Sequence, residues 1–155
     1  MQYVQLRLFS KRKPPNDSGP AEFDDPYFGR LRLDKQAGWI GTKLFSPVGR
    51  NVEFALGHGA GEPSERQREF FQQIEAKYPA LLAQYHADLV GNGEPFQDGS
   101  SPQAFFDSLR LEFIRLPFPS DTPTLWEMVF TTELDNHVIT LRFSDWVFQS
   151  DGWDG

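Results

Sequence analysis

The chain has 155 residues, a length typical of one domain that can bury its own core, and we expect residues 1–155 to form a single domain. Its net charge of −7 disfavours nucleic-acid binding, because the phosphate backbone would be repelled. It has no cysteine, which excludes a disulfide framework, a thiolate metal site and a cysteine nucleophile, and which fits a reducing compartment.

The first predicted element is a strand. Residues 2–10 alternate polar and apolar side chains, with Val4, Leu6 and Leu8 on one face. This segment lacks the apolar core of a secretory signal, and no later segment approaches the roughly 18 consecutive apolar residues of a membrane span. We therefore expect a cytoplasmic protein that has no membrane association.

Three further strands are predicted at residues 28–33, 38–45 and 51–56, and apolar and polar side chains alternate in the first and the third. Before them, the acidic pair Asp24 and Asp25 belongs to a turn-rich stretch that we expect to form a loop. Gly and Pro residues separate the three strands and supply turns between them. The region therefore predicts an antiparallel meander.

The strongest helix signal covers about residues 64–90, where Ser64 and Gln67 fit a capping box. Apolar residues recur at spacings of three and four and predict a stripe that packs on the sheet: Phe70, Phe71, Ile74, Tyr78, Leu81, Leu82, Tyr85 and Leu89. The polar side of this helix is expected to include Glu65, Arg66, Gln73 and Gln84. Pro79 would remove a helical hydrogen bond, so we expect a kink or a split near residues 77–78.

Strand patterns return after a short helical turn predicted at residues 102–108. The predicted strands cover residues 109–116, 125–134 and 137–148, and a two-residue turn at 135–136 would join the last two as a hairpin. Strands thus come before and after one helical region, without the alternation that builds parallel sheets. The sequence predicts an α+β fold, in which an antiparallel sheet of about six to seven strands carries a central kinked or split helix on one face.

No motif in the sequence supports a catalytic or metal site. The glycine-rich loop at residues 57–61 lacks the Gly-Lys-Ser/Thr of a phosphate-binding loop, and there is no Gly-x-Ser-x-Gly elbow. His58, His86 and His137 have no metal-ligand spacing. We predict no catalytic residue, no metal and no cofactor. The alternative is a small enzyme or ligand-binding domain that uses His58 or His137.

The C-terminal residues are the best candidates for a binding surface, because they combine tryptophan with acidic side chains: Asp145, Trp146, Asp151, Trp153 and Asp154. Tryptophan is enriched at binding hot spots, and acidic residues steer basic partners. Trp146 could instead complete the core of the last strand, whereas Trp153 lies so near the chain end that its own domain has few ways to bury it. The leading hypothesis is a non-enzymatic protein-binding module with a basic protein partner.

The first half of the chain also carries a family resemblance. The segments Phe28-Gly29-Arg30-Leu31, Trp39-Ile40-Gly41 and Val52-Glu53-Phe54-Ala55-Leu56 resemble the opening of small uncharacterised bacterial α+β domains. Several such families are immunity proteins encoded beside polymorphic toxins. The resemblance covers roughly the first ninety residues and contains no catalytic residue. It is therefore a similarity of fold, which implies function only by analogy. It implies an immunity-type inhibitor of a toxin.

Overall fold

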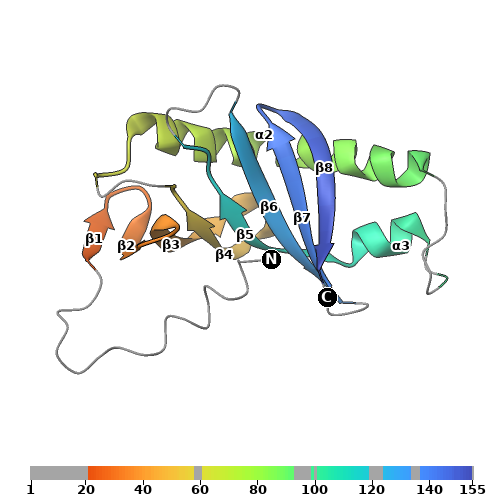
Figure 1. The fold of residues 1–155 in the computed structure, drawn as a ribbon, viewed down its shortest axis with the longest axis horizontal. Helices are drawn as coiled ribbons and strands as arrows, with labels where there is room; N and C mark the ends of the chain where they lie inside the picture. Colours follow the sequence, from red (N-terminus) through yellow and green to blue (C-terminus); the bar gives the residue numbers. More distant parts are fainter. Residues whose placement is uncertain are drawn as a thin grey trace.

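The computed structural model describes residues 21–57, 61–92, 99, 101–118, 124–133 and 137–154. Within these ranges the fold is α+β, as predicted: one sheet carries one long helix and one short helix (Figure 1). The sheet has eight strands, more than the six to seven expected. The strand predicted at residues 2–10 lies outside the described residues.

The first four strands form the predicted meander, with one strand more than expected. The strands are β1 (Glu22–Asp25), β2 (Gly29–Asp34), β3 (Gly38–Phe45) and β4 (Arg50–Ala55), and a short 3₁₀ turn, η1 (Ser46–Val48), joins the last two. Asp24 and Asp25, expected in a loop, pair with β2. Hydrogen bonds to the neighbouring strand, rather than apolar alternation, specify β1.

The eight strands follow one another across the sheet in chain order, and one of the seven neighbouring pairs is parallel. The parallel pair joins β4 to β5 (Leu109–Arg115). Between these strands the chain forms α2 (Glu65–Gly91) and α3 (Pro102–Asp107). These helices return the chain to the starting end of the sheet, so β5 runs in the same direction as β4. The sequence interpretation of a wholly antiparallel sheet is wrong at this crossover.

The last three strands are β6 (Leu125–Thr132), β7 (Val138–Ser144) and β8 (Val147–Asp154). The strand predicted at residues 137–148 is therefore two strands, separated by a turn at Asp145, whose φ is +49°. Thr131 pairs with Val138, whereas a two-residue turn would have paired Leu134 with His137. The observed register differs from the predicted one by two residues. The alternation of apolar residues predicts that Trp126, Met128 and Phe130 share a face with Ile139, Leu141 and Phe143, and the shift by two keeps them on that face.

Helix α2 begins with the predicted capping box at Ser64 and continues without a kink through Pro79. The expected kink or split is absent because the helix is held on both sides of the proline by the buried side chains of Tyr78 and Leu81. Pro79 itself is exposed, so the carbonyl that loses its helical partner is on a side that water can reach. The free energy gained by packing α2 on the sheet therefore outweighs the loss of one helical hydrogen bond at Pro79.

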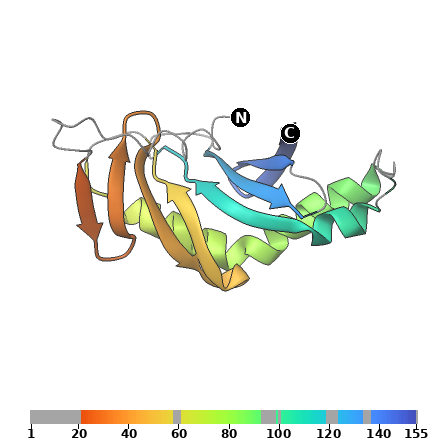
Figure 2. The ribbon, with the colours of Figure 1, turned by 90° about the horizontal axis from the view of Figure 1, so that it is seen from below.

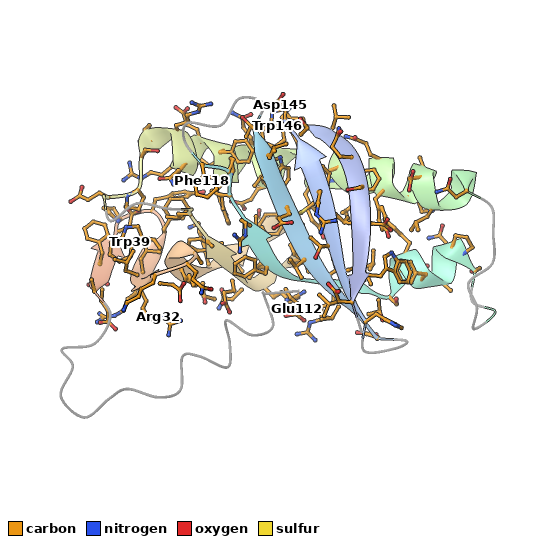
Figure 3. The ribbon with its side chains drawn as sticks, viewed as in Figure 1. Arg32, Trp39, Glu112, Phe118, Asp145 and Trp146 are labelled. Carbon is orange, nitrogen blue, oxygen red and sulfur yellow. The ribbon has the colours of Figure 1, made fainter. Side chains whose placement is uncertain are left out.

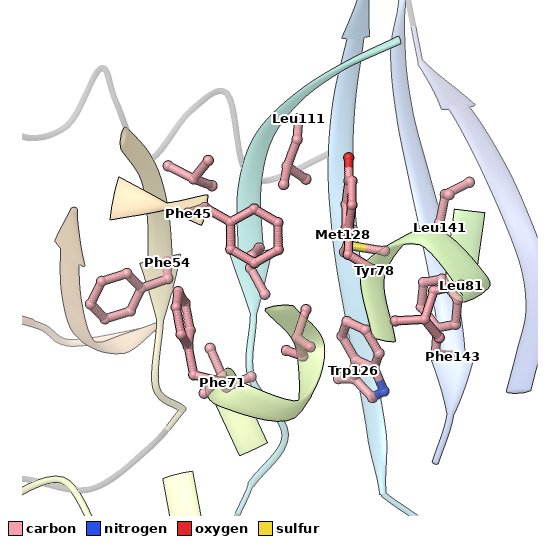
Figure 4. Packing of buried hydrophobic residues seen from close by; sticks show 14 of the residues in the cluster. Phe45, Phe54, Phe71, Tyr78, Leu81, Leu111, Trp126, Met128, Leu141 and Phe143 are labelled. Carbon is pink, nitrogen blue, oxygen red and sulfur yellow. The ribbon is translucent and has the colours of Figure 1, made fainter. Parts of the chain in front are cut away.

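Both helices lie on one face of the sheet, as Figure 2 shows edge-on. The core forms between α2 and the sheet, where Phe71 meets Phe45 and Phe54 edge-on at 5.9 and 5.7 Å between ring centroids (Figure 4). The predicted helix stripe is largely confirmed by five buried residues: Phe71, Ile74, Tyr78, Leu81 and Tyr85. Phe70 is half-buried.

None of the helices in the described ranges is both long enough and apolar enough to span a membrane.

Candidate functional site

Strand β8 forms one edge of the sheet (Figure 1). It pairs with β7 along one side, and no strand of the described part of the chain pairs with its other side. Two large apolar side chains of β8 are exposed: Val147, with 57% of its surface, and Trp153, with 40%. The edge therefore offers a strand side that no other strand of the described residues pairs with, together with apolar side chains.

Trp153 is packed on one side and open on the other. Its ring stacks on Phe105 of α3 at 4.6 Å and an interplanar angle of 11°. Its Nε1–H donates a 2.8 Å hydrogen bond to Oδ2 of Asp151. Because Trp153 belongs to β8, its ring is held against Phe105, while 40% of the residue remains accessible.

Asp151 joins this surface to the helix beneath. Its Oδ2 also accepts a 2.8 Å hydrogen bond from the hydroxyl of Tyr85, whose pKa is raised by burial and further by the charge of Asp151. Tyr85 is therefore a permanent donor at neutral pH, and it holds the carboxylate in one place. Asp154, the last described residue, pairs with Val138 and occupies the alternate position to Trp153 along β8.

Asp145 and Trp146 lie at the opposite end of β8 from Trp153, in the turn after β7 (Figure 3). The main chain and side chain of Asp145 exchange hydrogen bonds with the backbone of Thr124, and its carbonyl accepts 2.7 Å from Nε1–H of Trp126. The ring of Trp146 stacks on Phe70 of α2 at 4.6 Å. The five predicted binding residues thus form two groups, and the group at the turn has structural contacts.

Gln84 of α2 fixes the start of β8, although the sequence interpretation placed it on the polar side of the helix. Its side-chain amide donates 2.9 Å to the carbonyl of Trp146 and accepts 2.8 Å from the N–H of Phe148. Polarity indicated a solvated residue, and no local pattern distinguishes a glutamine that binds a strand edge. Its position, directly before the buried Tyr85, is the only signal in the sequence.

The histidines do not form a common site in the described part of the chain. Nε2 of His86 lies 2.6 Å from Oε1 of Gln103, and its ring rests edge-on against Phe106. The His137 ring lies 6.2 Å from the Trp153 ring. His58 is outside the described residues. Among the residues that are described, no three His, Asp or Glu side chains are placed to hold a metal ion.

No protein-family model, curated protein or solved structure matches this chain. The site must therefore be interpreted from its own geometry.

Proposed function

We propose that this chain is a non-enzymatic protein-binding module that accepts a strand of its partner along the outer edge of β8. The observation that carries the proposal is an eight-residue edge strand with two exposed large apolar side chains. Strand addition derives affinity from backbone hydrogen bonds and specificity from alternate side chains. Val147 and Trp153 are the exposed large apolar side chains of β8 that would provide that specificity.

The charge of the surface selects a basic partner. Asp151 and Asp154 both belong to β8, and the whole chain has a net charge of −7. A partner strand with lysine or arginine would gain attraction during the encounter, and that attraction is screened by salt. Asp151 is already oriented by Tyr85, so binding costs little side-chain entropy at this position.

An immunity-type inhibitor is the form of binding module that the sequence resemblance favours. Such a protein binds a toxin encoded beside it and blocks its action. The proposal is tested by expressing each neighbouring gene product with and without this chain and measuring cell survival. If no neighbouring gene product is toxic, or if this chain neutralises none of them, the immunity role is ruled out. Binding through β8 is tested by a separate experiment.

Binding through β8 is tested by placing a photo-crosslinking residue at Val147 in the cells that produce the protein. A matched control places the same residue at Leu44 in β3, because both side chains are 57% exposed. We expect a discrete cross-linked protein from position 147 that is absent from position 44. Equal products from both positions, or none from 147, would contradict the proposal.

The partner so identified is then used to measure affinity. Val147→Lys adds the charge with which natural edge strands resist pairing, and it should weaken binding at least about tenfold. Leu44→Lys adds the same charge at equal exposure and should leave the Kd within about twofold. Both variants should melt like the parent protein, because each replaces an exposed side chain.

A further inference from the structure

Strands β4 and β5 are joined along only part of their length. Their parallel pairing covers residues 53–55 and 113–115, and β5 has a register shift between Leu111 and Phe113. Where the two strands begin, a cleft of about 380 Å³ opens to solvent. Among the described residues its apolar lining comes from Val48, Leu109 and Leu111. This volume is within the range of small-molecule sites.

Arg50, the first residue of β4, lies in this cleft. Its guanidinium donates a hydrogen bond to the carbonyl of Leu111, across the gap between the strands. A guanidinium has five N–H donors, and this carbonyl is the one acceptor that Arg50 meets within the described ranges. The remaining donors are available to an anion in the cleft.

Tyr78 of α2 contributes a second donor. Its ring packs edge-on against Phe45 at 5.1 Å, and its hydroxyl points away from the helix toward the end of β5 that holds Leu111 (Figure 4). No other described residue hydrogen-bonds that hydroxyl. Burial raises the pKa of Tyr78 to about 12, although the charge of Arg50 opposes the shift. The hydroxyl is therefore protonated at neutral pH and can donate.

From this juxtaposition we infer that the cleft between β4 and β5 binds a small organic carboxylate with a short branched alkyl group. A guanidinium matches a carboxylate with two parallel hydrogen bonds, and the Tyr78 hydroxyl supplies a third donor. The alkyl group packs on Val48 and Leu109, which are only partly buried.

A singly charged ligand fits the cleft better than phosphate. Glu133 lies on the cleft lining and repels a second negative charge. Arg110 also borders the cleft, but its Nε is 3.4 Å from a carboxylate oxygen of Glu112, which compensates its charge. Arg50 is thus the main uncompensated cation of the site. This site is separate from β8, so the inference is independent of the protein-binding proposal.

The test is an NMR titration of the ¹⁵N-labelled chain with 4-methylpentanoate, its uncharged amide and inorganic phosphate, each up to about 20 mM, since small fragments bind in the millimolar range. We expect saturable shifts from the carboxylate, concentrated at the amides of residues 48–50 and 109–111, and at least about tenfold weaker binding of the amide. Equal binding of the amide, or absence of localised shifts, overturns the inference. Stronger binding of phosphate overturns the assignment to a carboxylate.

Two variants link the shifts to the donors. Arg50→Gln should weaken the carboxylate at least about tenfold, and Tyr78→Phe several-fold, while the affinity for the amide stays the same. Tyr78→Phe leaves the ring in place, so it tests the site even if Arg50→Gln loosens β5. Arg142→Gln removes an equal charge from an exposed arginine outside this cleft and should have no effect. Unchanged affinity in Tyr78→Phe and Arg50→Gln, both folded, overturns the inference.

Discussion

The two edges of the sheet formed by the described residues differ in length, charge and apolar exposure. β1 has four residues, and its Glu22 and Asp24 form ion pairs with Arg30 of the neighbouring strand. β8 has eight residues and exposes Val147 and Trp153. Short, charged edges resist pairing with other chains, and long edges with exposed apolar side chains permit it. We therefore expect a partner strand to pair with β8 and not with β1.

Helix α2 fastens both edges, with different chemistry at each. At β1 an ion pair joins the buried carboxylate of Asp25 to the partly exposed Arg68 at 3.1 Å. At β8 two side chains of the helix, Gln84 and Tyr85, make hydrogen bonds to the strand. A buried charge that loses its partner costs more free energy than a partly exposed hydrogen bond. The β1 edge should therefore be the less tolerant of substitution.

The largest effect is expected from Asp25→Ala. The buried carboxylate accepts hydrogen bonds from the N–H groups of Tyr27 and Phe28, both at 2.8 Å, and from Arg68. Its removal leaves these donors without their acceptor and should lower the free energy of unfolding by about 3 kcal/mol. Urea unfolding at neutral pH measures the loss. A loss below about 0.5 kcal/mol would show that the β1 edge is not fastened by this residue.

The same substitution has a predicted pH dependence. Burial alone would raise the pKa of Asp25, but the hydrogen bonds from Phe28 and Tyr27 and the contact with Arg68 outweigh it and hold the pKa below its ordinary value of 3.8. A carboxyl group whose pKa is lowered by folding stabilises the folded state at pH values above its ordinary pKa. This stabilisation disappears as the pH falls through the pKa of the folded state. The difference between parent and Asp25→Ala should therefore be largest near neutral pH and shrink below about pH 4. A constant difference would contradict the ionised carboxylate.

A smaller loss is expected from Gly41→Ala in β3, on the same half of the sheet as β1. A Cβ at this position would lie 2.7 Å from Leu31 and 2.8 Å from Phe54, both fully buried in the core. Neither neighbour can move into solvent, so the methyl group overpacks the core and should cost about 2 kcal/mol. Thermal unfolding gives the measurement, and a parent-like Tm would mean that this half of the core has spare volume.

The sequence predicted the elements that local patterns determine. Alternation specified the faces of β6 and β7, and the capping box specified the start of α2. It missed β1, because a four-residue strand with acidic side chains has no apolar alternation. It also merged β7 with β8, because the turn at Asp145 depends on a positive φ and not on glycine or proline.

The candidate site was predictable only in part. The sequence singled out Trp153 by its position, but not its stacking on Phe105, which depends on where α3 packs. Gln84 is polar, as expected of a solvated helix face, and its hydrogen bonds to the start of β8 arise only from tertiary packing. The cleft at Arg50 depends on how far β4 and β5 pair, which no local pattern records. Long-range register is the information that a single sequence did not provide.

At the β8 edge, Tyr85→Phe should cost about 1 kcal/mol, because it removes one hydrogen bond while the buried ring remains. Asp151 keeps the hydrogen bond from Nε1–H of Trp153, so its carboxylate is not left without a donor. Chemical denaturation measures the change, and the affinity for the partner measures whether Asp151 needs to be oriented. A loss as large as that of Asp25→Ala would remove the contrast between the two edges.

The smallest effect is expected from Gly152→Ala in β8, the counterpart of Gly41→Ala. A Cβ at this position would lie 2.9 Å from Nη1 of Arg142, a distance only slightly longer than those at Gly41. The atom it meets is the end of a flexible side chain that is 52% exposed, and its ion pair with Glu127 is long, at 3.7 Å. The guanidinium can therefore move into solvent, and the free energy of unfolding should change by less than about 0.5 kcal/mol. Thermal unfolding of the two glycine variants side by side decides the point: equal losses would mean that β8 is packed as rigidly as the β1 half, and an edge of that kind could not adjust to an added strand.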